Sequence, residues 1–162
     1  VGFGSMNVKD ASRLLDVVIK SVSELNIRTI IPNKWLEIDG RSLPDNFLAV
    51  GHIPFRLLFP HLAVIVHHGG AGTITTAARA GVPQVVIPHV MDQHYWGHRV
   101  YELGIGPKPL VYKQLSVHSL TSALRETLGS LAMKKKAHLL SVKIEGRDGA
   151  VELAKVLCDD LG

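Results

Sequence analysis

Cysteine, aromatic residues and long apolar runs are all scarce in this sequence. Cys158 is the only cysteine among 162 residues, so an internal disulfide is excluded and a reducing compartment such as the cytoplasm is expected. No stretch approaches the ~20 apolar residues that cross a bilayer, and no basic-then-apolar signal peptide opens the chain. These absences favour a globular, cytoplasmic protein over a secreted or membrane-spanning one.

A strong charge of either sign is also missing. Lys and Arg number 18 against 14 Asp and Glu, which leaves a net charge of +4. The only dense basic run, Lys134–Lys136, is typical of a solvated helix face, because a nucleic-acid footprint covers a stripe or a whole face. The hydrophobic fraction of 46% indicates a folded core. The small positive excess suits an anionic small ligand, and no nucleic-acid partner is expected.

Short β-rich runs alternate with helical patterns along the chain, which is the pattern of βαβ units around a parallel sheet. Strands are expected up to residue 3 and over 28–31, 47–50, 63–66, 84–87 and 110–112. Helices are expected over 10–25, 55–59, 72–80, 93–103, 116–128, 131–144 and 147–161. We therefore predict one α/β domain over residues 1–162, a doubly wound Rossmann-like parallel sheet with helices on both faces. Because the chain opens on a strand end and a glycine turn, we expect it to be one domain of a longer protein.

The most informative segment is His67–Thr73, which follows a predicted central strand and precedes a helix. In such a sheet, ligands bind beyond the carboxyl ends of the strands. The glycines let the backbone approach a ligand, and the helix start offers N–H groups and a dipole that favour an anion. A pyrophosphate fits these features, and the alternative is a glycine turn with helix-capping groups. The segment lacks the Walker and dinucleotide spacings, and adjacent histidines point to opposite sides, so no metal site is expected.

A second polar cluster, Pro88–Gln93, also lies between a strand and a helix. Asp92 and Gln93 supply acceptors and an amide donor that match the adjacent hydroxyls of a sugar. Alternatively, Asp92 is the N-cap of the helix that begins near Gln93. Elsewhere, Ser5 follows the first strand and either donates to a phosphate or caps the next helix.

Two segments are candidates for lining a base pocket. Trp35 and the run His52–Pro54 follow the second and third predicted strands. An indole face would allow stacking on a base, whereas packing in the core or at a domain interface is the alternative for Trp35.

Taken together, several of these motifs resemble the C-terminal domain of the UDP-glycosyltransferase superfamily. The closest likeness is to sterol glucosyltransferases and to bacterial macrolide and glycopeptide glycosyltransferases, and it extends over essentially the whole chain. The segments that carry it are Gly2–Met6, His67–Thr73, Ala80–Pro83, Pro88–Arg99 and Ile144–Gly149. The block from His67 to Gln93 is specific for this superfamily when taken as a whole, although none of its parts is specific alone.

The resemblance implies one half of a two-domain GT-B enzyme that holds a UDP-sugar or dTDP-sugar. The positions it implies for the diphosphate are Ser5, His67, Gly70, Ala71, Gly72 and Thr73. It implies Asp92 and Gln93 for the sugar, and Ile53 for the main-chain contact to the base. Enzymes of this family use no metal or other cofactor, so positive groups and the helix dipole must stabilise the departing diphosphate.

Three departures from the family pattern matter. His52 stands where plant members have a base-stacking Trp, and Trp35 is the candidate substitute. Thr75 and Thr76 occupy the region of the ribose-binding Glu, which leaves uracil and thymine both open. The acceptor-activating His and its Asp partner belong to the N-terminal domain, so the catalytic residues remain unknown and none of the nine histidines is given that role.

The function expected from this resemblance is donor binding in an inverting, metal-independent glycosyltransferase. The enzyme would move a hexose to a hydroxyl of a lipophilic acceptor, and this chain alone would be inactive. Its expected partner is an N-terminal acceptor-binding domain or subunit, through which the protein would contact a membrane peripherally. The alternatives are a non-catalytic nucleotide-sugar-binding subunit of a split glycosyltransferase, or an epimerase or other GT-B enzyme. The lack of site carboxylates other than Asp92 counts against an epimerase.

Overall fold

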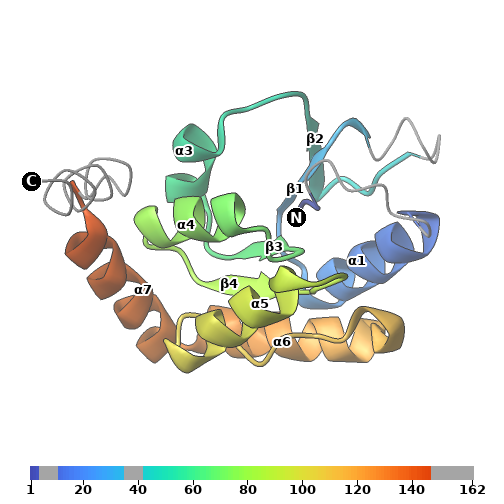
Figure 1. Cartoon of the computed structure of the whole chain (residues 1–162). Helices are drawn as coiled ribbons and strands as arrows, with labels where there is room; N and C mark the ends of the chain where they lie inside the picture. The colour runs from blue at the N-terminus through green and yellow to red at the C-terminus, as the bar shows by residue number, and fades with distance from the viewer. Residues whose placement is uncertain (4–10, 35–41, 147–162) are drawn as a thin grey trace, which may run out of the picture.

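The computed structural model describes residues 1–3, 11–34 and 42–146 as an α/β chain of alternating strands and helices (Figure 1). The strands are β1 (Thr29–Pro32), β2 (Phe47–Val50), β3 (Ile65–His67) and β4 (Gln84–Val86). The helices are α1 (Ala11–Leu25), α3 (Phe55–Leu58), α4 (Ala71–Arg79), α5 (Asp92–Glu102), α6 (Val117–Gly129) and α7 (Leu131–Ile144). Two 3-10 helices, η1 (Phe59–His61) and η2 (Tyr112–Gln114), complete the described elements.

The strands form two parallel pairs, β1 with β2 and β3 with β4. The segment Val1–Phe3 joins the pairs, because the Val1 amino group donates to the Ile30 carbonyl at 2.7 Å and the Gly2 N–H donates to the Val66 carbonyl at 3.0 Å. At the far edge, the Leu110 N–H donates to the Val86 carbonyl. The order across the sheet is therefore β2, β1, Val1–Phe3, β3, β4 and Leu110, which is the order of a doubly wound fold. The predicted fold class is confirmed.

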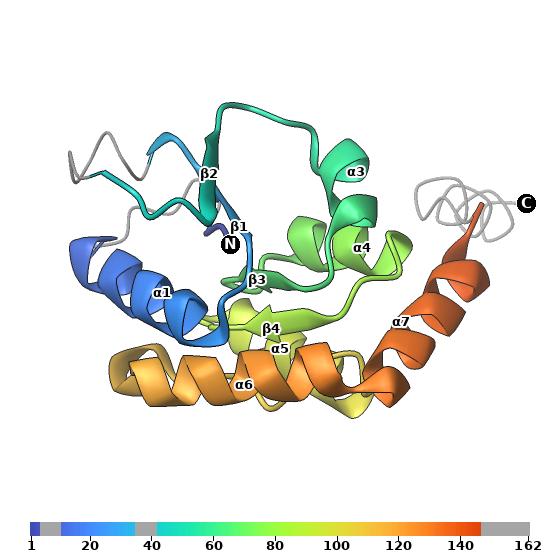
Figure 2. The same cartoon turned by 180° about the vertical axis from the view of Figure 1, so that it is seen from behind.

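Helices cover both faces of the sheet (Figures 1 and 2). On one face, α1 and α6 lie side by side and enclose the largest apolar cluster together with Val66 and Val85. On the other face, α4, α5 and α7 pack around Val86, while α3, η1 and α4 pack around Ile65. Neighbouring residues of β3 and β4 thus face opposite layers, and both layers are apolar because the strands are buried on both sides.

Local sequence explains where several helices begin and end. Ser116 caps α6 by accepting from the Ser119 N–H at 3.2 Å, and the Ser119 hydroxyl accepts from the Ser116 N–H in return. Gly81, with φ +69°, follows α4, where a left-handed residue ends a helix at low cost. Ser130 caps α7 by accepting from the Met133 N–H.

The structure differs from the sequence-based prediction at the sheet edges. Six strands were predicted, and four are formed among the described residues, since residues 1–3 and 110 each contribute only backbone bonds to a neighbouring strand. The strand predicted over 110–112 is not formed: Leu110 makes one backbone bond to Val86, and Tyr112 already begins η2. Pro107 and Pro109 lack N–H donors, so this edge cannot form a continuous ladder. Ser5, Trp35, Cys158 and the helix predicted over 147–161 lie outside the described residues.

Within the ranges that the structure describes, no helix combines the length and apolar character needed to cross a membrane.

Candidate functional site

The candidate site lies where the strand order reverses, between Val1–Phe3 and β3. The carboxyl ends of these strands and of β4 meet there, and the starts of α4 and α5 follow directly (Figure 1). Ring contacts connect two of these strand ends and η2: His89, beyond β4, packs edge-on against Phe3 with ring centroids 5.3 Å apart, and its ring is tilted against that of Tyr112 with centroids 4.0 Å apart. Such a reversal point is where open α/β sheets bind their ligands.

The turn between β3 and α4 depends on Gly69. Its φ is +96°, and a Cβ at this position would lie 2.9 Å from Val86 Cγ1 and 3.1 Å from the Gln93 carbonyl oxygen. Side-chain-bearing residues rarely adopt this backbone conformation, and the neighbours leave no room for a methyl group. Glycine is therefore required for the chain to turn from β3 into α4 directly beneath the loop that follows β4.

The start of α4 presents unbonded backbone donors. Gly70 is the N-cap and provides no side-chain bond, so the N–H groups of Ala71, Gly72 and Thr73 have no intrahelical acceptor. Ala71 and Gly72 are exposed. Among the described residues, no hydrogen bond engages the Thr73 hydroxyl. In contrast, the hydroxyls of Thr75 and Thr76 donate to carbonyls one turn earlier in the helix. The helix start can therefore hold an anion, with the Thr73 hydroxyl as an additional donor.

His67 is placed differently from the sequence-based interpretation, which turned its ring toward a diphosphate. The side chain is 1% exposed. Its Nδ1 accepts from the Gly69 N–H at 3.0 Å, so Nε2 carries the proton and donates to Gln84 Oε1 at 3.0 Å. The Gln84 amide in turn donates to the Ile74 carbonyl. Both ring nitrogens are engaged because His67 shares a strand face with Ile65, and α4 covers that face.

This buried network makes His67 a positioning residue of the glycine turn. Burial lowers the pKa of His67 from 6.5 to about 4, while the hydrogen bond with Gln84 opposes the shift. The ring is therefore neutral at physiological pH. A neutral ring with a fixed tautomer connects the turn to β4 and to α4, and it contributes no positive charge to the site.

His68 is the histidine that faces the start of α4. Its Nε2 would lie 2.8 Å from a Cβ placed on Gly70, so the ring sits against the N-cap. Its Nδ1 is buried and has no hydrogen-bond partner among the described residues. Burial lowers the pKa of His68, and the nearby Asp92 carboxylate opposes this. A bound anion would meet a ring donor and free helix N–H groups at one place.

His89 is a further titratable side chain at this point. Burial lowers its pKa, the Ile87 backbone opposes the shift, and His68 and His94 lower the pKa further. No donor or acceptor in the described parts of the chain meets either ring nitrogen with hydrogen-bond geometry. The site thus contains two imidazoles, that of His68 after β3 and that of His89 after β4.

The loop before α5 separates the roles of Asp92 and Gln93. Gln93 is 6% exposed, and its side-chain oxygen accepts from the His89 and Val90 N–H groups. It therefore holds the loop, which corrects the prediction that both side chains face a sugar. Asp92 is exposed and occupies the first helical position, while the N-cap is Met91, which makes no side-chain capping bond. Asp92 is thus not the N-cap, and its carboxylate faces the solvent near His68.

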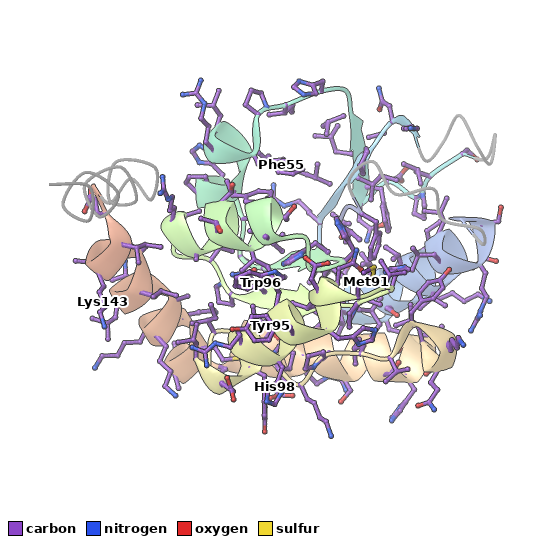
Figure 3. The ribbon with its side chains drawn as sticks, in the orientation of Figure 1. Phe55, Met91, Tyr95, Trp96, His98 and Lys143 are labelled. Atoms are coloured by element: carbon purple, nitrogen blue, oxygen red, sulfur yellow. The ribbon has the colours of Figure 1, made fainter. Side chains whose placement is uncertain are left out.

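Met91 marks the loop as strained. Its φ is +40°, a value that non-glycine residues adopt at a cost, and its side chain is 86% exposed beside the start of α5 (Figure 3). Strained backbone held by surrounding bonds is frequent at functional sites. Here the two bonds accepted by Gln93 hold it.

The predicted base-binding segment connects β2 to α3. His52 is exposed and Ile53 is 36% exposed. Phe55, the first residue of α3, stacks on Phe59 with centroids 4.6 Å apart, and 44% of its surface remains accessible (Figure 3). The segment therefore offers a base both exposed main chain and an aromatic surface. The other base-binding candidate, Trp35, lies outside the described residues, as does Ser5, the candidate for the diphosphate.

Sequence reasoning missed His68, His89 and Met91 as site residues. His68 was seen, but strand parity alone could not identify the face of β3 that a helix covers. The sequence signal that could have pointed to His68 is that it stands two residues before Gly70, the N-cap of α4. Of the described residues, no group of three His, Cys, Asp or Glu side chains is arranged to hold a metal ion.

Comparison with known proteins decides the family. Residues 14–159 match the family of the erythromycin biosynthesis protein CIII-like C-terminal domain. The chain belongs to this family. Within it, the chain is 36% identical over 151 residues to a sterol 3-beta-glucosyltransferase of Arabidopsis thaliana and 32% identical over 169 residues to one of Saccharomyces cerevisiae. The two alignments cover 92% and 99% of this chain, but only 24% and 14% of the length of those relatives.

Solved glycosyltransferase structures share the fold of this CIII-like domain. The glycosyltransferase VinC in complex with DTDP superposes with a TM-score of 0.77 at 27% identity, covering 98% of this chain and 40% of VinC. SnogD from Streptomyces nogalater superposes with a TM-score of 0.69 at 25% identity, covering 99% and 41%. The resemblance inferred from the motifs is confirmed at the level of fold and family.

Proposed function

We propose that this domain binds the nucleotide-sugar donor of an inverting, metal-independent glycosyltransferase. The donor is a UDP- or dTDP-hexose, and the acceptor is a hydroxyl of a lipophilic molecule. The sterol glucosyltransferase names of the relatives support the acceptor class, and the DTDP complex of VinC supports the donor class. The acceptor and the group that activates it are assigned to a separate N-terminal domain, since the chain spans about a quarter of its Arabidopsis relative.

One observation carries the proposal: the uncapped start of α4 and the His68 ring converge at the point where the strand order reverses. Three features favour a diphosphate there, namely N–H groups without an intrahelical acceptor, the positive end of the helix dipole and an imidazole whose buried Nδ1 meets no hydrogen-bond partner within the described ranges. Together they can bind an anion of two phosphates without a metal ion.

The same groups would assist departure of the nucleoside diphosphate. As the bond between the sugar and the diphosphate breaks, negative charge grows on the leaving oxygen, and fixed donors stabilise that charge without reorganising. His68 can donate a hydrogen bond to the diphosphate and gains basicity beside it, whereas His67 stays neutral and holds the turn. Asp92, exposed near His68, is placed to accept hydrogen bonds from sugar hydroxyls.

Nucleotide binding tests this proposal. Calorimetry with UDP and with dTDP in EDTA is expected to give a Kd of ~10–1000 μM, roughly 4–7 kcal/mol, because no second domain closes over the ligand. His68→Ala is expected to weaken binding by about 1–3 kcal/mol, since it removes a donor to a charged group. His118→Ala, an exposed histidine on α6, is the control and should change nothing. A strict requirement for a divalent ion, or equal losses in both variants, would contradict the assignment.

Sugar recognition by Asp92 is tested separately from nucleotide recognition. Asp92→Asn replaces an ionised acceptor by a neutral amide, so UDP-glucose is expected to bind at least about fivefold more weakly, which is on the order of 1 kcal/mol. UDP affinity should stay nearly unchanged. The quantity to measure is the ratio of the two affinities, with Glu102→Gln at the opposite end of α5 as the matched control. An unchanged ratio would place the sugar site elsewhere.

A further inference from the structure

We propose that the outer face of α7 docks this domain on an anionic membrane surface. This outer face consists of Leu131, Lys135, Leu139, Val142 and Lys143. The proposal stands apart from the donor site, because it concerns a different end of the domain and needs no nucleotide. It also differs from the expectation that membrane contact belongs to the N-terminal half.

The charge of α7 is of one sign. Its 14 residues contain four lysines and no Asp or Glu, and the next acidic residue, Glu145, follows the end of the helix. Arg79 ends the neighbouring helix α4. The closest acidic side chain on α5, Glu102, is paired with Arg99 and His98. A surface of anionic headgroups attracts such a helix, because each lysine close to the membrane strengthens binding roughly fivefold.

The outer face is also apolar. Leu131 is 79% exposed, and Leu139 and Val142 are each 56% exposed. With Lys135 they are spaced at i, i+4, i+8 and i+11, so they form one stripe along the helix. The opposite stripe, which includes Ala137 and Leu140, packs into the domain. α7 is therefore apolar both on the side that packs against the domain and on its outer face. If the outer face contacted only water, it would not need these apolar side chains.

The lysines around this stripe have different tasks. Lys134 Nζ donates to the Leu128 carbonyl at 2.7 Å, and the Lys136 side chain lies against Gly104. Both therefore fasten α7 to neighbouring segments. Lys135 is exposed, and Lys143 extends from the outer side of the helix (Figure 3). These two can keep their charges at the headgroup level while Leu139 and Val142 enter the acyl boundary.

The position of α7 leaves the donor site open. It packs against the carboxyl ends of α4 and α5: a Cβ built on Gly81, after α4, would lie 3.0 Å from Ser141 Oγ, and one built on Gly104, after α5, would lie 2.6 Å from Lys136 Nζ. Figures 1 and 2 show α7 at one end of the domain. The candidate site lies at the opposite ends of the same helices, about 13 Å away along the nine residues of α4. A membrane bound to α7 would not cover it.

A lipid surface fits this face better than a protein partner does. Three exposed apolar side chains fall well short of the ~800 Å² that each protein buries in a standard interface. Shallow insertion of a few apolar side chains combined with lysines is sufficient for reversible membrane binding.

Vesicle sedimentation of the 162-residue chain without nucleotide tests the proposal. Binding is expected to phosphatidylcholine vesicles that contain about a third phosphatidylserine, and not to pure phosphatidylcholine. Lys135→Gln with Lys143→Gln should weaken binding about twenty-five-fold, roughly fivefold for each charge. The control pair, Lys20→Gln with Lys108→Gln, removes the same charge from other exposed sites and should stay within about twofold of wild type.

The apolar contribution needs its own variant. Leu139→Gln with Val142→Gln keeps the charge and should weaken binding about tenfold or more, with an unchanged Tm. The proposal would be overturned if the control lysine variant lost as much vesicle affinity as the α7 lysine variant, or if the apolar variant bound vesicles as well as wild type. Either result would show only a general attraction between a basic protein and an anionic surface. A lowered Tm of the apolar pair would also overturn the proposal, because that would show a face covered by protein. These outcomes are independent of whether UDP binds.

Discussion

Gly69→Ala is expected to destabilise the domain by about 3 kcal/mol or more and to abolish nucleotide binding. An alanine would hold an unfavourable φ of +96° and would place its methyl group 2.9 Å from Val86 Cγ1 and 3.1 Å from the Gln93 carbonyl oxygen. The positive φ costs roughly 1–2 kcal/mol, and overpacking adds about 1–3 kcal/mol. Because relief requires β3 and the loop before α5 to separate, the helix start and His68 would no longer converge. Urea unfolding and calorimetry with UDP measure the two effects.

Gly72→Ala is the matched control for the stability effect of this change. Gly72 lies two residues into α4, and no atom lies within 4 Å of a Cβ built there. Alanine is the better helix former, so this variant should gain about 0.5–1 kcal/mol of stability. A Gly69→Ala protein with the unfolding midpoint of wild type would show that the turn has another conformation than the one described.

Acidification from pH 7 to pH 4 is expected to remove about 3 kcal/mol of stability through His67 alone. The pKa of its buried ring is lowered from 6.5 to about 4, and each pKa unit corresponds to about 1.4 kcal/mol. Between these two pH values the unfolded chain holds the extra proton, so stability rises with pH across this window and is lost as the pH falls. Burial of His68 and His89 acts in the same direction.

Two measurements isolate the part of His67. In His67→Gln, the pH dependence of the unfolding free energy between pH 4 and 6.5 should be shallower than in wild type, whatever the absolute stability of the variant. In the wild-type protein, NMR titration should find the His67 ring neutral and protonated on Nε2 from pH 6.5 down to about pH 5, as its bonds with Gly69 and Gln84 require, and charged only as the pH approaches 4. A His67 ring that titrates near 6.5 would refute the buried network.

Both predictions concern the same buried network, in which His67 joins the turn at Gly69 to Gln84 and so supports the candidate site. The turn at Gly69 brings the start of α4 beneath the loop before α5, and His67 fastens that turn to Gln84 on β4. Loss of either feature should therefore reduce binding through the geometry of the helix start, whereas His68→Ala should reduce binding in a domain of normal stability. Comparing the stability of these variants with their nucleotide affinity distinguishes positioning from direct contact.

The sequence by itself determined the elements whose signals are local. The boundaries of β2 and α7 were predicted to the residue, and α6 begins after its Ser116 cap as expected, because period, capping residues and glycine stops all lie within a few positions of one another. The strand, glycine turn and helix around His67–Thr73 were predicted for the same reason. Together with the remaining motifs they identified the fold and the family, which the comparisons confirmed.

Only the tertiary structure decided which side chains face the site. β3 is buried on both faces, so its sequence shows no polar side, and only the packing of α4 over Ile65 and His67 reveals that His67 points inward and His68 toward the helix start. Likewise, the carboxamide of Gln93 holds the loop because the turn of Met91 brings the His89 and Val90 N–H groups to it. The orientation of His67 depends on its contact with Gln84, 17 residues further along the chain, and that of Gln93 on the irregular backbone at Met91. Neither feature leaves a local periodicity that the sequence shows.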